Sequence, residues 1–213
     1  MSLLMDMTLR EFSQVLASSE PAPGGGSTAA LSGVLASSLT MMVVNLSTGK
    51  KSFEALEENI RHKALEDFEA VKALNQELSM LVDEDTKAFR LFMEAMKLPK
   101  ETEEERKNRE DSMQQAALYA LQVPLTVAEK CLGILRHQLH IARYGNKNAV
   151  SDVGVGSLLA FAGLEGAALN VNINLPGISD ANVRMDASEK IAAFRKEGSE
   201  LKIKITEVVN SRI

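Results

Sequence analysis

Residues Glu54 to Leu98 read EALEENIRHKALEDFEAVKALNQELSMLVDEDTKAFRLFMEAMKL. This stretch contains neither glycine nor proline, and most of its residues are strong helix formers. Apolar residues recur in it at spacings of three and four, with one interruption, which places them on one side of a helix. They are Val71, Leu74, Leu78, Leu81, Ala88, Phe92 and Ala95. We therefore predict one long central helix whose apolar seam packs against other helices.

The chain before this helix predicts two further helices separated by a break. Thr8 and Glu11 have the spacing of a capping box, which marks the start of a short amphipathic helix. Two prolines and three consecutive glycines then interrupt the chain, and Ser27 is a candidate N-cap for the next helix. Residues 21–49 carry no charge, but their serines and threonines and the missing basic flank upstream favour a buried core helix over a membrane span.

The chain after the long helix predicts three more helices. Pro99 ends the long helix, and residues 100–109 are a charged connector, either a solvated loop or a helix start. Helical stretches follow at 111–144, with a kink at Pro124, at 151–174, and from about 180 to the C-terminus. No strand-like alternation is present. We predict an all-α protein in which residues 1–213 form a single multi-helix domain.

Composition and charge exclude some classes of function. The net charge is −5, and aromatic residues make up 4% of the chain, with no tryptophan. Proteins that neutralise phosphates or stack bases need basic and aromatic residues, so we expect no nucleic-acid partner. Cys131 is the single cysteine and cannot form an internal disulfide, and the N-terminus does not resemble a secretory signal. We expect a cytoplasmic protein with Cys131 as a small buried apolar residue.

Asp85 interrupts the apolar seam of the long helix. A carboxylate there must be paired, neutralised or used chemically, because an unpaired buried charge is costly. Asp83, two residues earlier, points to nearly the opposite side. Asp85 is therefore a functional group, a cap for a neighbouring helix, or the partner of a buried basic residue.

A glycine-rich loop is a second candidate site. Gly24, Gly25, Gly26 and Ser27 precede an apolar helix. The glycines expose backbone N–H groups, and the start of the helix adds the positive end of its dipole. The loop therefore suits an anion, although the same motif also occurs as a plain turn.

Two asparagine-rich motifs are further candidates. The turn that includes Asn146, Asn148, Ser151 and Asp152 concentrates hydrogen-bonding groups that suit a polar heterocycle, although either of the last two residues could simply cap the next helix. At the end of that helix stand further amides, Asn170, Asn172 and Asn174, which either bind a ligand or satisfy the helix terminus.

The three histidines do not form a metal motif. His62, His137 and His140 lack ligand spacing with cysteine or acidic partners, so we expect no metal site. We interpret the last two as solvated side chains or as imidazoles stabilised by a helix end.

Several motifs in order resemble the formiminotransferase-cyclodeaminase C-terminal domain family. They are PAPGGGS at 21–27, GKK at 49–51, LVDED at 81–85 with AF at 88–89, EAMKLP at 94–99, VPL at 123–125, GN at 145–146 with SD at 151–152, and NV at 170–171 with NL at 174–175. The family includes the cyclodeaminase half of a bifunctional mammalian enzyme and free-standing bacterial cyclodeaminases and methenyltetrahydrofolate cyclohydrolases. The resemblance spans nearly the whole chain. It implies an all-helical, methenyltetrahydrofolate cyclohydrolase-like fold, a unit that is at least a dimer, and a tetrahydrofolate substrate without a further cofactor.

The resemblance also implies residue roles. Asp85 matches the aspartate assigned to cyclodeaminase catalysis, and we expect it to stabilise a cationic substrate and to move a proton from N10 to the leaving nitrogen. The other candidates would bind the folate: Gly24, Gly25, Gly26 and Ser27 a pterin or carboxylate, Lys50 and Lys51 the glutamate tail, and Asn146, Asn148, Ser151 and Asp152 the pterin, with Asn170 and Asn174 as further contacts. The two lysines stand where the mammalian relative has arginines, which keeps the charge but loses the bidentate geometry.

The predicted reaction converts 5-formiminotetrahydrofolate to 5,10-methenyltetrahydrofolate with release of ammonia. Methenyltetrahydrofolate cyclohydrolase activity and folate binding without catalysis stay open as alternatives. Because aromatic residues are few, we expect little aromatic stacking on the pterin. A stripe of small residues permits close helix contact, either within one subunit or across a homodimer interface; its members are Gly156, Ala160, Gly163 and Ala167. We expect no membrane partner.

Overall fold

The computed structural model describes residues 3–213, and these contain helices but no strand. The α-helices are α1 (Leu9–Leu16), α2 (Gly25–Ser47), α3 (Lys51–Glu54), α4 (Glu58–Met96), α5 (Glu103–Tyr144), α6 (Val150–Asn174) and α7 (Ala181–Arg212). Three short 3-10 helices accompany them: η1 (Leu4–Asp6), η2 (Lys147–Ala149) and η3 (Leu175–Gly177). The all-α prediction is confirmed.

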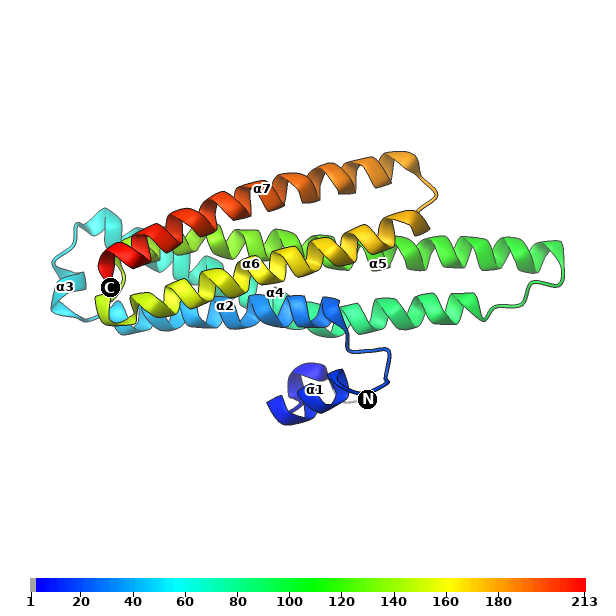
Figure 1. Ribbon diagram of the computed structural model, residues 1–213, viewed down its shortest axis with the longest axis horizontal. Coiled ribbons are helices and arrows are strands. Elements are labelled where there is room, and N and C mark those ends of the chain that lie inside the picture. The colour runs from blue at the N-terminus through cyan, green and yellow to red at the C-terminus, as the bar shows by residue number, and fades with distance from the viewer. Residues whose placement is uncertain (1–2) are drawn as a thin grey trace.

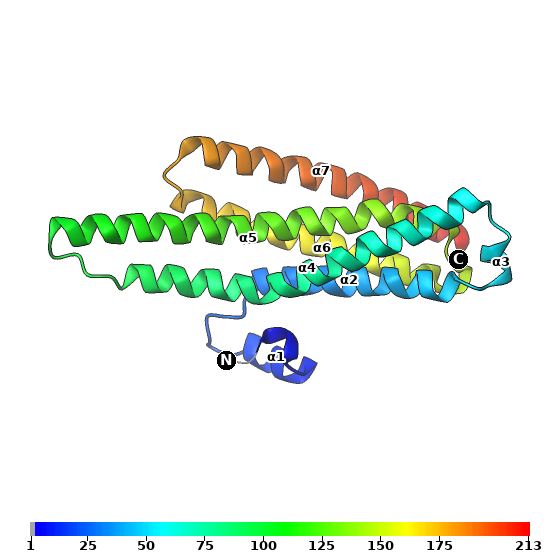
Figure 2. The same ribbon diagram turned by 180° about the vertical axis from the view of Figure 1, so that it is seen from behind.

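Four long helices form an elongated bundle. α2 packs against α4 and α6, and α5 packs against the same two helices from the other side. α7 covers part of α5 and α6. Figures 1 and 2 show α2 and α6 along one broad side of the bundle and α4 and α5 along the opposite side. The hairpin of α4 and α5 extends well beyond the start of α2 and the end of α6 (Figure 1).

The predicted seam of α4 forms part of the core. Of its members, Val71 and Leu78 are completely buried, and Leu74, Leu81 and Phe92 are partly buried against the core. Val82, which the predicted seam did not include, is also completely buried. Burying such a side chain contributes about 1.5–3 kcal/mol, which outweighs the weaker helix propensity of the two valines. The seam therefore fixes which side of α4 faces the bundle, and it turns Asp85 toward the start of α2.

The stripe of small residues on α6 lies inside the subunit. Its members are buried against α2, and a Cβ at Gly163 would come within 2.8 Å of the carbonyl oxygen of Ala29. A Cβ at Gly156 would come within 3.2 Å of the carbonyl oxygen of Ala36. The stripe lets two backbones of one chain approach closely, so the intramolecular alternative is confirmed and the stripe is not a dimer interface.

Several predicted helix boundaries are wrong. The long helix begins at Glu58, because α3 and a short turn take up the residues before it. For the charged connector, the helix-start alternative is confirmed, because Thr102 and Glu105 form a capping box that starts α5 at Glu103, earlier than the predicted 111. Gly24 is the N-cap of α2, so Ser27 lies within its first turn. Neither Ser151 nor Asp152 caps α6: its N-cap is Ala149, without a side-chain hydrogen bond.

Other local predictions are confirmed. Thr8 and Glu11 form the capping box of α1, and Asp180 caps α7. Pro124 lies buried inside the continuous helix α5, and the kink expected there stays a prediction.

Three helical stretches within residues 3–213 are long and apolar enough to cross a membrane, judged by length and composition: 25–47, 103–144 and 147–177. About half of the most apolar window of each is buried inside the bundle, namely 50%, 56% and 44%. The remainder of α2 and α6 faces outward.

Candidate functional site

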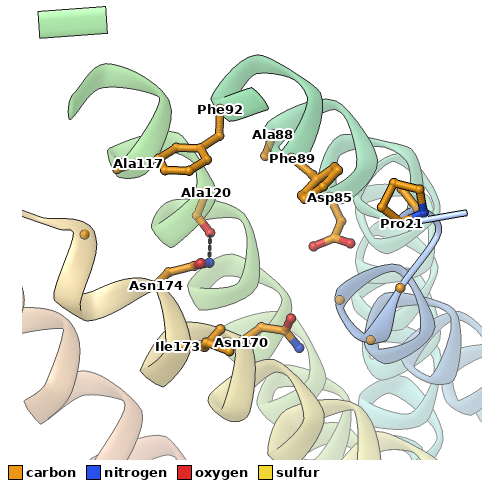
Figure 3. Close-up of a pocket in the computed structure, with 15 residues that line it drawn as sticks. Pro21, Asp85, Ala88, Phe89, Phe92, Ala117, Ala120, Asn170, Ile173 and Asn174 are labelled. Atoms are coloured by element: carbon orange, nitrogen blue, oxygen red, sulfur yellow. Dashed lines mark hydrogen bonds between the residues drawn. The ribbon is translucent and has the colours of Figure 1, made fainter. Parts of the chain in front are cut away.

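A cavity of about 410 Å³ lies where α2 begins and α6 ends. Its floor is formed by the glycine loop before α2, and its walls are formed by α4, α5 and the last turn of α6. Figure 3 shows the carboxylate of Asp85 on one wall, with Asn170 and Asn174 across the cavity from it. The cavity therefore combines the two strongest sequence candidates, the glycine loop and the aspartate on the seam.

Ser27 holds the carboxylate of Asp85. The backbone N–H of Ser27 donates to Oδ2 of Asp85 at 2.9 Å, and its hydroxyl lies 3.2 Å from the same oxygen. The hydroxyl also donates to the carbonyl oxygen of Val82 at 2.8 Å. Ser27 is fully buried, so it cannot touch a ligand, and its predicted role in substrate binding is wrong. It positions Asp85 instead.

The start of α2 thus binds an anion that belongs to the chain itself. From the sequence we expect the backbone N–H groups at this helix start to attract a negatively charged group of the ligand. One of these N–H groups is used by Asp85. The N-terminal end of a helix favours a nearby negative charge, so α2 helps to keep a carboxylate at the cavity wall.

Burial raises the pKa of Asp85, and the side-chain and backbone hydrogen bonds from Ser27 oppose this rise. The partial burial disfavours the charged form, while the hydrogen bonds stabilise it. A carboxyl group with a raised pKa takes up a proton more readily than an ordinary aspartate, which suits it to proton transfer during a reaction. Of the alternatives that the sequence left open for Asp85, a cap for a neighbouring helix fits these contacts, because Asp85 accepts hydrogen bonds from the first turn of α2, and the partner of a buried basic residue does not.

Gly26 makes room for the carboxylate. A Cβ at this position would lie 1.9 Å from Oδ1 of Asp85 and 2.5 Å from its Cγ. At Gly25, the Cβ would meet only the side-chain nitrogen of Asn170, at 3.6 Å. Position 26 therefore requires glycine for a steric reason, because a side chain there would collide with the carboxylate of Asp85.

Two asparagines from the end of α6 face the cavity. Nδ2 of Asn170 donates to the carbonyl oxygen of Gly166 at 2.8 Å, and Nδ2 of Asn174 donates to that of Ala120 at 2.7 Å. Both amides are held in place by these bonds. Asn172 is exposed and is not among the residues that line the cavity.

Two phenylalanines also line the cavity, and the expectation of little aromatic stacking on the pterin stays a prediction. Phe89 and Phe92 stand on α4, one and two turns after Asp85 (Figure 3). The low aromatic content of the chain gave no reason to expect phenylalanines at the site. Their positions four and seven residues after Asp85 on one helix could have predicted that they lie on the same side as Asp85. Ile173, Ala117 and Ala120 add further apolar surface.

Comparison with known proteins shows the family of the chain. The family model described as Formiminotransferase-cyclodeaminase matches residues 8–193. The chain belongs to this family. A methenyltetrahydrofolate cyclohydrolase of Methylorubrum extorquens is 35% identical over 206 residues, which cover 97% of both chains. The formimidoyltransferase-cyclodeaminase of Gallus gallus is 36% identical over 96% of this chain, which spans 38% of the relative's length.

A solved structure from the formiminotransferase-cyclodeaminase family has the same fold. The formiminotetrahydrofolate cyclodeaminase of Thermotoga maritima superposes with a TM-score of 0.84, at 26% identity and with 97% of each chain covered. The family assignment and the helical bundle predicted from the sequence are both confirmed. The named relatives place the chain among the enzymes of folate one-carbon metabolism.

The remaining predicted site residues of this family member lie at the other end of the bundle. They are Lys50, Lys51, Asn146, Asn148, Ser151 and Asp152. The turn before α6 packs against the end of α2: the backbone N–H of Asn146 donates to the hydroxyl of Ser47 at 2.7 Å. The start and end of α2 are separated by about 33 Å at 1.5 Å per residue. These six residues therefore do not join Asp85 in one site within one chain.

The histidines do not have the surroundings that we expected. Nδ1 of His137 lies 2.7 Å from Oδ1 of the buried Asp67, which also receives a bond from Lys63 at 2.5 Å. Burial acts to raise the pKa of Asp67, but the hydrogen bonds and charges of His137 and Lys63 together lower it. This cluster joins α4 to α5 and is separate from the cavity.

Cys131 behaves as expected. It is completely buried in the core, and burial raises the pKa of its thiol to about 12. It cannot act as a nucleophile in this environment.

Proposed function

We propose that this protein is a formimidoyltetrahydrofolate cyclodeaminase, which converts 5-formiminotetrahydrofolate to 5,10-methenyltetrahydrofolate and ammonia. The observation that carries the proposal is the carboxylate of Asp85, held by a buried serine at the wall of a cavity of about 410 Å³. Membership of the family and the likeness to the Thermotoga maritima cyclodeaminase support it.

The reaction is an addition followed by an elimination. N10 of the substrate attacks the amidine carbon and forms a tetrahedral intermediate, and the C–N bond to the leaving nitrogen then breaks. Asp85 takes the proton that N10 loses and delivers a proton to the departing ammonia. Its negative charge also stabilises the protonated amidine and the cationic methenyl product. We assign the substrate to Oδ1, because Ser27 binds Oδ2.

The walls of the cavity suit a pterin. Phe89 and Phe92 offer flat apolar surface to a heterocycle, while Asn170 and Asn174 supply amide groups at the opposite wall. Such a site, mostly apolar with a few fixed polar groups, is typical of small-molecule pockets. Partial exclusion of water also strengthens the interaction between Asp85 and a cation.

Methenyltetrahydrofolate cyclohydrolase activity is the second candidate. The relative from Methylorubrum extorquens carries that name and matches over 97% of its length. In that reaction water adds to the methenyl carbon and the N5–C bond opens, which gives 10-formyltetrahydrofolate. Asp85 would then take a proton from the attacking water.

Two further statements belong to this proposal. Both candidate reactions are additions and eliminations at one carbon, assisted by proton transfers and without oxidation or reduction, so we propose that no cofactor other than the folate substrate is required. Activity that survives dialysis against a chelator would agree with the absence of a metal cofactor, and loss of activity would contradict it.

We also propose that the working unit is a homodimer, because the outer sides of α2 and α6 expose apolar residues.

A spectrophotometric assay tests the proposal. Methenyltetrahydrofolate absorbance should rise when the protein is given 5-formiminotetrahydrofolate, after the uncatalysed rate is subtracted. If absorbance only falls, when methenyltetrahydrofolate itself is supplied, the second candidate is correct. If calorimetry shows folate binding but neither substrate turns over, the protein binds folate without catalysis and both reactions are excluded.

A further inference from the structure

The polar side chains around the cavity present oxygen atoms to a ligand. Among the described residues that line the cavity, those with polar side chains are Asp85, Asn170 and Asn174. Ser27 binds Oδ2 of Asp85, so Oδ1 is the oxygen that the substrate meets on this wall. The two asparagines stand on the opposite wall, at the end of α6 (Figure 3).

The side-chain nitrogens of both asparagines are already bound. Nδ2 of Asn170 donates to the carbonyl oxygen of Gly166 at 2.8 Å, and Nδ2 of Asn174 donates to that of Ala120 at 2.7 Å. A carbonyl oxygen only accepts hydrogen bonds, so turning either amide over would place two acceptor oxygens against each other. The orientation of each amide is therefore fixed, and Oδ1 is the atom left for a ligand.

The two asparagine oxygens form what we call the acceptor wall. Figure 3 shows the side-chain oxygen of Asn170 turned toward the side of the cavity that carries Asp85. A Cβ at Gly25 would lie 3.6 Å from Nδ2 of Asn170, which places the nitrogen against the glycine loop instead. Both asparagines are half-buried, so water competes only partly for their oxygens. The acceptor wall therefore favours a ligand that directs N–H groups toward it.

A reduced pterin offers an N–H group at the matching position. In the pterin of the proposed substrate, N5 carries the reacting group, and N8 stands opposite N5 in the same ring. Asp85 acts on the group at N5, so N8 points toward the other wall, where Asn170 stands. N8 carries a hydrogen in the dihydro and tetrahydro forms. In fully oxidised folate it has a lone pair instead, which would face Oδ1 and repel it.

We propose that Asn170 determines which oxidation state of the pterin is bound. Its Oδ1 accepts a hydrogen bond from N8–H of a reduced pterin, while the 2-amino group, on the same edge of the ring, lies within the reach of Asn174. Fully oxidised folate is disfavoured because it lacks the N8 hydrogen. This inference rests on the proposed function for the identity of the ligand, and it goes further by assigning a residue to one atom of the pterin.

A neutral acceptor suits this position better than a second carboxylate. Asp85 is the charged residue among those described around the cavity. An uncharged amide at position 170 accepts a hydrogen bond without adding another negative charge, so the attraction for the cationic amidine stays at Asp85. The two walls therefore have separate tasks: Asp85 acts on the reacting group, and Asn170 selects the ring.

Calorimetric binding of 7,8-dihydrofolate and of folic acid tests the inference. Both compounds lack a substituent on N5 and carry the same tail, but only dihydrofolate has a hydrogen on N8. A site built to accept a hydrogen bond rejects an analogue that lacks the donor. We expect the wild type to bind dihydrofolate more tightly than folic acid, by about 5-fold or more. A ratio near one in the wild type would overturn the inference.

Asn170→Leu removes the acceptor oxygen and nearly keeps the size of the side chain. It should bind the two compounds with affinities that agree within about 2-fold, because neither gains a hydrogen bond from leucine. The matched control is Asn172→Leu, on the same helix but exposed and outside the cavity, which should keep the wild-type ratio. A wild-type ratio in Asn170→Leu would overturn the assignment of Asn170.

Asn170→Asp provides a second test if the leucine variant does not fold. It loses the donor to Gly166 but keeps an acceptor oxygen, so it should retain the preference for dihydrofolate. A folded Asn170→Asp protein that binds both compounds equally would contradict the inference. Circular dichroism shows whether each variant is folded.

Failure of the proposed function gives a different pattern. In that case the wild type turns over neither 5-formiminotetrahydrofolate nor methenyltetrahydrofolate, while the binding ratio and its loss in Asn170→Leu are unaffected. Turnover by a wild type that binds dihydrofolate and folic acid equally would leave the proposed function standing and overturn the role of Asn170.

Discussion

Gly26→Ala should disable Asp85 and leave the bundle folded. The added Cβ would lie 1.9 Å from Oδ1 of Asp85, whereas real Cβ atoms essentially never come closer than 3.0 Å to another heavy atom. The oxygen must therefore move by about 1.1 Å or more. A displacement of about 1 Å in a reacting group can cost about 100-fold in rate, and we expect kcat to fall by about that factor.

The same substitution should change stability little. Alanine favours a helix over glycine by up to about 1 kcal/mol, and crowding of Asp85 costs about 1–3 kcal/mol. The net loss of about 2 kcal/mol or less is small beside a typical unfolding free energy of about 5–15 kcal/mol. Urea denaturation followed by circular dichroism measures it, and methenyl absorbance measures kcat.

Gly25→Ala is the matched control for the crowding of Asp85. Its Cβ meets only Asn170, at an ordinary distance of 3.6 Å, so its loss of kcat should be much smaller. A Gly26→Ala enzyme that works as fast as wild type would refute the reasoning, because the carboxylate would then not need its present position. Equal losses in both variants would refute it too, since crowding of Asp85 would not be the cause.

Three further predictions concern other groups. Cys131 should resist thiol reagents in the native protein and react only after denaturation, because it is buried with a pKa of about 12; native labelling would contradict this. His137→Ala removes one of two hydrogen-bond donors to the buried carboxylate of Asp67, so it should lower the unfolding free energy, measured by urea titration, by about 1–3 kcal/mol. The control His62→Ala removes only an exposed ion pair and should lower it by less than about 1 kcal/mol. Because burial raises the pKa of Asp85, kcat/KM should fall on acidification at a higher pH than an ordinary aspartate would cause, and an acid limb at or below about pH 3.9 would argue against the assignment.

The sequence was sufficient to predict the bundle and its key carboxylate. Spacings of three and four fixed the side of α4 that is buried, and Asp85 stood out because it broke that pattern. The glycine loop was also predicted as a site, but its use was not: whether its N–H groups bind a ligand or Asp85 depends on how α2 packs against α4. That is a tertiary contact between residues 58 positions apart.

Helix ends were harder to predict, for local reasons. Gly25 and Gly26 read as helix breakers, yet they start α2 because the first N–H groups of a helix need no partner within it. The polar turn before α6 was grouped with Asp85 because both belong to family motifs, although sequence order does not reveal which end of a bundle a turn occupies.

The most direct test of the central claim is the turnover of 5-formiminotetrahydrofolate by Asp85→Asn. The substitution keeps the size of the side chain and removes its ability to accept a proton. We predict that kcat falls by about 100-fold or more, while calorimetry still shows folate binding and the melting temperature does not fall. A rate near that of the wild type would contradict the assignment of Asp85 as the catalytic residue.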